Sequence, residues 1–185
     1  MRILGLSGSL RRDSHNTQLL RAAAELLPAG VDFFIHDGIR EIPPYDADLS
    51  HTPGPEPVER LRAAVREADA VLIATPEYNH SIPGALKNAL DWLSRPLASS
   101  PLQGKPTLVI GGSTGMFGAV WAQAEARKVV AAIGAHVLDR ELPIPNIDEQ
   151  FDFHGHLIEE SLAQMLSELL DELTEATTPR STAAA

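Results

Sequence analysis

The feature that most constrains the fold is an unbroken apolar run in the middle of the chain, Ala70 to Thr75, with the letters AVLIAT. A strand without polar alternation is buried on both faces, as in a parallel sheet covered by helices. Shorter apolar runs at 3–6, 31–35, 107–110 and 135–138 alternate with segments of helical periodicity. This alternation predicts an α/β fold with a doubly wound parallel sheet of five strands in the order 2-1-3-4-5.

Apolar side chains spaced three and four residues apart predict the helices between these strands. A chain of 185 residues is long enough for one core. We therefore expect a single domain over residues 1–175 and a disordered tail over residues 176–185, which lack apolar periodicity. The helices are expected over the stripe from Leu19 to Leu27, over 58–68, after Pro83-Gly84, over 118–133 and over the stripe from Ile158 to Leu173.

Composition excludes several classes of function. A net charge of −10, with 15 basic residues scattered among 25 acidic ones, disfavours nucleic acid as a partner. With no cysteine, the chain has neither a disulfide nor a thiol nucleophile, so redox chemistry would require a bound cofactor. No apolar segment approaches the roughly 18 residues of a membrane span, and Met1-Arg2-Ile3 begins a strand rather than a signal peptide. We expect a cytoplasmic protein without a membrane partner.

The segment after the first strand has the composition of an anion-binding loop. It reads Gly5-Leu6-Ser7-Gly8-Ser9-Leu10-Arg11-Arg12-Asp13-Ser14-His15-Asn16-Thr17 and runs directly into a helix. Backbone N–H groups, hydroxyls and the positive end of the helix suit a phosphate, and Arg11 adds a planar donor fork. The alternative is an ordinary capped helix start with Ser14 or Asn16 as the N-cap. The chain contains no G-x-x-x-x-G-K-[ST] motif, and Gly5 and Gly8 lack the third glycine of G-x-G-x-x-G. A nucleoside-triphosphate loop and a dinucleotide loop are therefore excluded, and the ligand is a different phosphate compound.

Two more loops are expected at the same edge of the sheet. Thr75 to Gly84 follows the third strand and contains two prolines, and Gly111 to Gly118 follows the fourth strand and contains four glycines. Each loop alone is consistent with a simple turn. The carboxyl ends of strands 1, 3 and 4 converge where the winding of the sheet reverses, and together the three loops favour a ligand site there.

Residues 8–16 and 75–92 strongly resemble the NADPH-dependent FMN reductase family, which includes quinone and chromate reductases and some azoreductases. The likeness extends from the first strand to the end of the fourth helix. It implies a flavodoxin-like fold, FMN as cofactor and NADPH or NADH as hydride donor. One departure is the start of the fourth helix, where many relatives place an arginine about where Val120 stands.

The resemblance also implies a set of cofactor-binding residues. The FMN phosphate would be held by Ser9, Arg11, Ser14, His15 (chiefly through its backbone) and Asn16. The isoalloxazine and ribityl would be lined by Pro76, Glu77, Tyr78 and Asn79, with Ser113 and Gly115 facing the ring. No side chain is expected to act as a catalytic acid or base, because hydride transfer between two cofactors does not require one. Glu77 is expected to have a hydrogen-bonding or structural role.

We therefore expect an enzyme that passes a hydride from NAD(P)H to FMN and two electrons on to a second acceptor in a ping-pong cycle. The acceptor would be a quinone, an azo compound, chromate or free flavin. The alternative is a flavodoxin-like electron carrier or a non-catalytic FMN-binding module, which would share the fold and the acidity. A phosphoacceptor signalling domain is excluded, because Leu6-Ser7-Gly8-Ser9 contains no acidic cluster.

Two histidines and three apolar helix residues are further candidates, for a metal site and for a subunit interface. His154 and His156 lack further ligands at a suitable spacing, so no metal is expected. Trp92, Leu93 and Trp121 add apolar surface to the helices and predict a homodimer or homotetramer, although all of them can equally be core residues.

Overall fold

A parallel sheet forms the centre of the protein in a computed structural model, which describes residues 1–50 and 53–178. The strand order is β2-β1-β3-β4-β5, as the sequence predicts, and β6 pairs with β4 outside this path. β1 and β3 run side by side with Leu4 opposite Val71. The strands are β1 (Arg2–Ser7), β2 (Asp32–His36), β3 (Ala70–Ala74), β4 (Pro106–Gly112), β5 (His136–Val137) and β6 (Pro143–Ile144).

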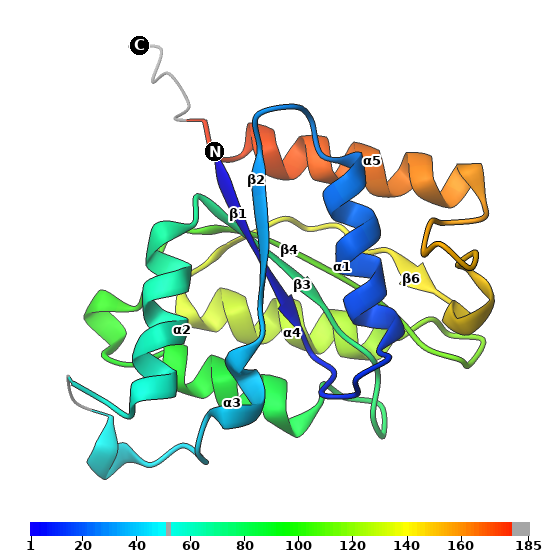
Figure 1. The fold of residues 1–185 in the computed structure, drawn as a ribbon. Helices are drawn as coiled ribbons and strands as arrows, with labels where there is room; N and C mark the ends of the chain where they lie inside the picture. The colour runs from blue at the N-terminus through cyan, green and yellow to red at the C-terminus, as the bar shows by residue number, and fades with distance from the viewer. Residues whose placement is uncertain (51–52, 179–185) are drawn as a thin grey trace.

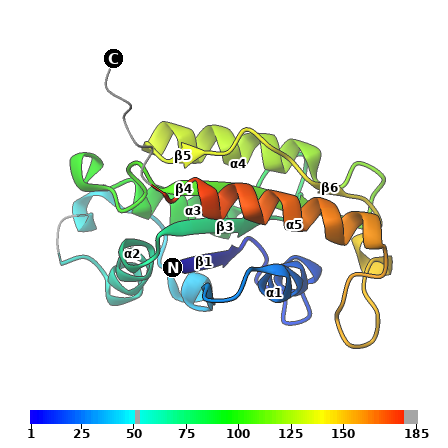
Figure 2. The ribbon, with the colours of Figure 1, turned by 90° about the horizontal axis from the view of Figure 1, so that it is seen from above.

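Helices cover both faces of the sheet, which gives three layers (Figures 1 and 2). One face carries α2 (Glu56–Glu67), α3 (Gly84–Leu93) and α4 (Val120–Ile133). The opposite face carries α1 (His15–Leu26) and α5 (Glu160–Glu175). Short 3-10 helices lie at Gly38–Glu41, Ala47–Leu49, Leu97–Ser99 and Ile147–Glu149. Among the described residues, none of the helices has the length and apolar character needed to cross a lipid bilayer.

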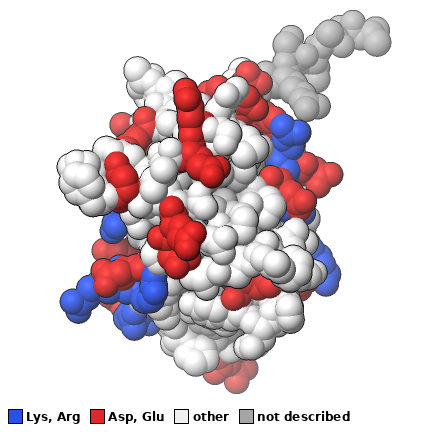
Figure 3. Space-filling model, turned by 90° about the vertical axis from the view of Figure 1, so that its right-hand side faces the viewer, with Lys and Arg blue, Asp and Glu red and all other residues white. Residues whose placement is uncertain are grey.

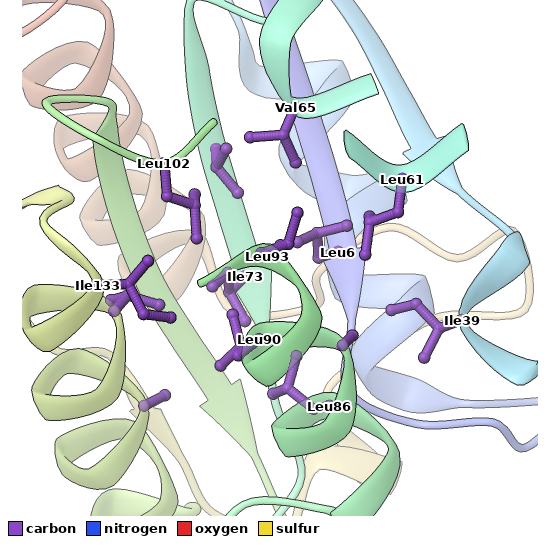
Figure 4. Close-up of a cluster of buried hydrophobic side chains, with 14 of the residues drawn as sticks. Leu6, Ile39, Leu61, Val65, Ile73, Leu86, Leu90, Leu93, Leu102 and Ile133 are labelled. Atoms are coloured by element: carbon purple, nitrogen blue, oxygen red, sulfur yellow. The ribbon is translucent and has the colours of Figure 1, made fainter. Parts of the chain in front are cut away.

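Leucine, isoleucine and valine side chains fill the space between the sheet and the α2/α3/α4 face (Figure 4). Leu86, Leu90 and Leu93 of α3 point toward Leu6 and Ile73 of the sheet. Their burial follows from the helical spacing seen in the sequence.

Trp92 belongs to this core as well. Its side chain is 0% exposed, and its indole Nε1 donates a 2.8 Å hydrogen bond to the carbonyl of Pro43. Leu93 is also fully buried, so neither residue offers surface to a second chain. Their assignment to an interface is therefore wrong, and the core alternative is right. Trp121, in contrast, is 41% exposed.

The opposite face is covered by two helices. α1 packs over β1, β3 and β4, and α5 packs on α1 and β4. Phe33 and Ile35 of the edge strand β2 pack against the core on this side and are only partly buried. A hollow lies between β2 and α1.

The far edge of the sheet differs from the prediction. β5 is shorter than the expected 135–138 strand and pairs only with the beginning of β4, at Pro106 and Thr107. β6 pairs with the end of β4, at Gly111 and Gly112, and was not predicted, because two residues carry no periodic pattern. α5 ends at Glu175, and residues 179–185 of the expected tail lie outside the described residues.

Candidate functional site

Helix α1 begins directly beneath the loop that follows β1. Ser14 is its N-cap, and the Ser14 hydroxyl accepts a 3.2 Å hydrogen bond from the N–H of Thr17. The N–H of Gln18 bonds to the carbonyl of Ser14, whereas those of His15 and Asn16 have no acceptor among the described residues. First-turn N–H groups without a partner, together with the positive helix end, form a binding position for an anion. The capped helix start and the anion loop are therefore compatible.

The side chain of Asn16 points inward rather than toward a ligand. It is 3% exposed. Its amide donates to the carbonyl of Gly112 at 2.9 Å and accepts from the N–H of Gly112 at 3.0 Å. This reciprocal pair ties the start of α1 to the end of β4. Only the backbone N–H of Asn16 is left for the phosphate role that the resemblance implies.

Hydroxyl groups hold the loop before α1 in shape. Ser7 Oγ lies 2.7 Å from Thr17 Oγ1, and Ser9 Oγ accepts from the N–H of Arg11 at 3.3 Å. Arg11 is exposed, and its Nη2 donates to the carbonyl of Asp13 at 2.5 Å. Its guanidinium is therefore held over the loop while further N–H donors remain for a ligand.

The loop after β3 folds into a tight turn. Tyr78 and Ser81 exchange backbone hydrogen bonds of 3.0 and 3.1 Å. The two residues between them, Asn79 and His80, have φ values of 54° and 61°. Two positive φ values in a row are typical of a type I′ turn, which asparagine tolerates well. The turn projects Tyr78 and Asn79 into solvent at the edge of the site.

Glu77 connects this turn to the start of α4. One carboxylate oxygen accepts from the N–H groups of Trp121 and Ala122 at 3.1 and 3.2 Å. The α4 helix has no cap of its own, because Ala119 precedes it with φ of 62° and no side-chain hydrogen bond. Glu77 thus caps α4 from another loop, and its negative charge suits a helix N-terminus. This hydrogen-bonding role agrees with the prediction for Glu77.

Two glycines at the end of β4 and in the loop after it lie in close contact with neighbouring backbone. A Cβ on Gly111 would lie 2.1 Å from the carbonyl oxygen of Thr75. One on Gly118, where φ is 57°, would lie 2.5 Å from the nitrogen of Ile144. Backbone already fills the space beside both glycines, so neither leaves room for a ligand there. At Gly115 the nearest atom is Ser113 Oγ at 3.8 Å, so close approach from outside remains possible there.

The buried side-chain amide of Gln123 joins three backbone segments beside the β4 loop by hydrogen bonds. Gln123 is 0% exposed, and its Nε2 lies within 3.1, 3.2 and 3.1 Å of the carbonyls of Gly111, Gly118 and Leu142. Its Oε1 accepts from the N–H of Leu142 at 2.9 Å. Gln123 therefore joins the end of β4, the start of α4 and the segment before β6.

The three loops enclose a pocket of about 170 Å³. The pocket contains most of the predicted site residues, whereas Asn79 and Gly115 lie outside its lining and Ser9 faces the hollow on the other side of the loop. Ile147, Gly112 and Thr114 also line the pocket, and none of them was predicted. Ile147 comes from the turn after β6, so no signal in the sequence marked it. The lining consists of Arg11, Ser14, His15, Asn16, Pro76, Glu77, Tyr78, Gly112, Ser113, Thr114 and Ile147.

Exposed aromatic residues stand next to this pocket. Trp121 lies with its ring centroid 4.8 Å from Phe117 and 4.8 Å from His80. Met116, Phe117 and Tyr78 are all at least half exposed. We call Tyr78, Met116, Phe117 and Trp121 the aromatic patch. Val120, at the start of α4, adds no positive charge beside it.

The family model of the NADPH-dependent FMN reductases matches residues 1–149. The chain belongs to this family. It is 40% identical over 174 residues to an NAD(P)H-dependent FMN reductase of Pseudomonas aeruginosa, covering 94% of this chain and 93% of that protein. It is 37% identical over 175 residues to a quinone reductase of Escherichia coli, covering 94% and 87%. This FMN reductase is therefore an oxidoreductase that uses FMN and NAD(P)H.

Solved structures agree with the family. FerB, a flavoenzyme NAD(P)H:(acceptor) oxidoreductase from Paracoccus denitrificans, superposes with a TM-score of 0.84 at 34% identity, over 95% of this chain and 96% of FerB. A flavodoxin of Bacillus cereus superposes with a TM-score of 0.61 at 12% identity, over 95% and 98%, and shows the shared fold alone. The flavodoxin-like fold of the FMN reductase is thereby confirmed.

The residues present fit the phosphate end of FMN. The unpaired N–H groups of His15 and Asn16, the capping hydroxyl of Ser14 and the guanidinium of Arg11 form one donor cluster. A pocket of about 170 Å³ is smaller than the roughly 300–1,000 Å³ of typical ligand sites, so a flavin would extend from it along the exposed surface beside Tyr78 and Gly115.

Proposed function

We propose that this FMN reductase passes a hydride from NADPH or NADH to FMN, and then two electrons to a small-molecule acceptor, in a ping-pong cycle. The observation that supports this most strongly is the meeting of loops from β1, β3 and β4 at one pocket whose phosphate end has unpaired donors and whose other end is open. Bound FMN supplies the two-electron chemistry, and the protein contributes position and electrostatics.

Each loop has a distinct task in this proposal. Arg11 and Ser14, with the N–H groups of His15 and Asn16, hold the phosphate, and Ser9 supports the loop by accepting a hydrogen bond from the N–H of Arg11. The loop of Pro76, Glu77, Tyr78 and Asn79 supplies a preorganised edge for the ring, because its turn is closed by its own hydrogen bonds and Glu77 fastens it to α4. Ser113 and Gly115 leave one face of the ring accessible.

The acceptor is proposed to be a quinone, an azo compound, chromate or free flavin. A quinone receives the strongest support, since relatives include the Escherichia coli quinone reductase and a 2-hydroxy-1,4-benzoquinone reductase of a Burkholderia species that is 38% identical over 173 residues. The aromatic patch beside the pocket offers apolar surface to a flat ring.

A homodimer or homotetramer is also proposed. Trp92 and Leu93 are buried and give it no support, whereas Trp121 is 41% exposed and can contact a second chain. Light scattering at low micromolar concentration should give at least twice the mass of one chain, and Trp121→Ser should lower it. A mass equal to one chain would end this proposal.

Anaerobic reduction tests the reductase assignment. Adding NADPH or NADH to the protein with bound FMN should remove the yellow colour in a single two-electron step, and a quinone should restore it. Hydride transfer needs the nicotinamide at about 3–3.5 Å from an open flavin face, which a pure electron carrier does not require. Failure of both nucleotides to reduce the flavin, while a one-electron reductant succeeds, would refute the proposal.

A further inference from the structure

A second and larger hollow lies on the other side of the loop after β1. It has a volume of about 1200 Å³ and runs between α1 and the edge strand β2. Figure 1 shows these two elements as neighbours, with the loop after β1 at their lower end. Arg11, in the loop between them, lines both this hollow and the flavin pocket, so the two lie on either side of its side chain. We call the hollow the β2 groove.

The floor of the β2 groove is apolar. Phe33 and Ile35 of β2 line it, and both side chains are only partly buried. Ala24 of α1 and the buried Ile39 complete this floor. Partly buried aromatic and aliphatic surface of this kind suits the flat face of a base or another planar ring.

The rim of the β2 groove is basic. Arg11, Arg12, Arg21 and Arg40 all line it. Within residues 1–50 and 53–178, none of these four arginines forms an ion pair, whereas six other arginines do: Arg2, Arg60, Arg62, Arg66, Arg127 and Arg140. In a chain of net charge −10, such a gathering of unpaired arginines is unexpected.

Two carboxylates and one histidine also face the groove, and they do not cancel this charge. Glu25 and Asp37 line it and leave an excess of positive side chains. Burial lowers the pKa of His36 below its ordinary value, so its ring is neutral at pH 7 and the positive charge comes from the arginines. On the side of the molecule that faces the viewer in Figure 3, carboxylates occupy the middle of the surface and basic side chains lie toward its margins.

The arginines are also placed to bind. Arg40 donates to the carbonyl of Leu10, and Arg11 donates to that of Asp13, so both guanidinium groups are held over the loop. Arg12 and Arg21 make no side-chain hydrogen bond within the described part of the chain and keep all their donors for a ligand. Arginine forks of this kind match phosphate oxygens.

We propose that the β2 groove binds the adenosine 2′-phosphate end of NADPH, with the base over Phe33 and Ile35 and the 2′-phosphate at Arg21 and Arg12. This inference rests on the proposed reductase function and deepens it by naming the part of the chain that distinguishes NADPH from NADH. The groove adjoins the flavin pocket at Arg11, so one extended dinucleotide can occupy both. The start of α4 carries Val120 and offers no cation for this purpose.

Calorimetry with adenosine 2′,5′-bisphosphate tests the groove without depending on activity. The FMN-loaded protein should bind this compound, and Arg21→Ala should weaken its binding about tenfold or more, while 5′-AMP should bind more weakly and respond little. Alanine is a strong helix former, so Arg21→Ala should leave α1 intact. Arg66→Ala, which removes an exposed arginine from α2 on the opposite face, is the matched control and should bind like the parent. Equal binding of the bisphosphate by the parent and Arg21→Ala would overturn the proposal.

Kinetics separates this inference from the reductase proposal. In Arg21→Ala the ratio of kcat/KM for NADPH to that for NADH should fall about tenfold or more, and in Arg66→Ala it should stay at the parent value. Equal losses with both nucleotides, or weaker FMN binding in Arg21→Ala, would show that the groove has another role and overturn the inference. If neither nucleotide is oxidised but the bisphosphate still binds through Arg21, the reductase proposal fails and the anion groove stands.

Discussion

The two faces of the sheet differ in what lies beside the edge strand β2. On the α2/α3/α4 face the core extends to the edge strand, where Phe34 packs against it and the guanidinium of Arg2 lies 4.7 Å from the Phe34 ring centroid. On the α1/α5 face, the neighbouring residues Phe33 and Ile35 remain partly open in the β2 groove. The three residues are similarly apolar in the sequence. All three are also partly buried, so the neighbours of the strand distinguish the faces: Arg2 lies over Phe34 on one side, and the β2 groove lies over Phe33 and Ile35 on the other.

Truncating one core residue on each face gives the largest test of this difference. Leu90→Ala should lower the free energy of unfolding by about 3–5 kcal/mol, because the Leu90 side chain of α3 is fully buried against the sheet. Ile35→Ala should lower it by about 1–2 kcal/mol, since the side chain is already partly exposed. Chemical denaturation measures both values. Equal losses would show that the β2 groove is closed in solution.

The phosphate site belongs to the α1/α5 face, since its loop leads into α1. Arg11→Ala should weaken FMN binding by about 1.5–3 kcal/mol, the range for a hydrogen bond to a charged group. Riboflavin, which lacks the phosphate, should bind almost as before. Arg12→Ala is the matched control, because Arg12 lies outside the flavin pocket. A fluorescence titration in which Arg11→Ala affects FMN and riboflavin equally would remove Arg11 from the phosphate site.

The ring side of the site belongs to the α2/α3/α4 face, where Glu77 joins the β3 loop to α4. Glu77→Ala should lower the free energy of unfolding by about 1–2 kcal/mol, because the N–H groups of Trp121 and Ala122 lose their acceptor. Glu125→Ala removes a surface carboxylate from the same helix and should change stability by less than about 0.5 kcal/mol. If the two variants behave alike in thermal unfolding, Glu77 does not cap α4.

The smallest expected effect is on the pH dependence of stability, through the Glu59 carboxylate that pairs with the buried Arg62 on α2. Burial acts to raise the pKa of Glu59, but hydrogen bonds from the N–H of Gly54 and from Arg62 outweigh it, so the pKa is lowered from 4.5. The pair therefore stabilises the protein fully above the ordinary pKa, and this contribution is lost as the pH falls through the lowered value. Glu59→Gln keeps an acceptor for Arg62 but has no titrating group.

Denaturation at a series of pH values checks this sign. Glu59→Gln should be less stable than the parent at pH 7, and the difference should shrink as the pH falls below about 4. A difference that stays constant across the acid range would assign the lowered pKa to another cause.

Much of the fold was readable from local patterns. The apolar runs of β1, β3 and β4 and the helical spacing of α3 each lie within one short segment, so their burial follows from periodicity. The loops at the carboxyl ends of these strands then follow from the topology. β6 was missed because its two residues carry no pattern of their own and pair only with β4. Trp92 was assigned to an interface because the apolar spacing of a helix does not show whether another part of the same chain covers its apolar face.

The site was predictable only in part, for a related reason. Residue types suited to phosphate stand together in one loop, so the sequence predicts Arg11 and Ser14 in one site, and both line the pocket. The roles of Asn16 and Glu77 depend on partners in distant loops, Gly112 and the start of α4, and no local pattern shows them. The β2 groove was also hidden, because Arg12, Arg21 and Arg40 belong to three separate segments.

The buried amide of Gln123 sets how this site can move. It bonds to the end of β4, the start of α4 and the segment before β6, so widening the pocket on that side would break several hydrogen bonds at once. These segments must therefore shift together as a rigid wall. Met116 and Phe117 are exposed and make no hydrogen bond with Gln123, so the tip of this loop is held less tightly than its two ends.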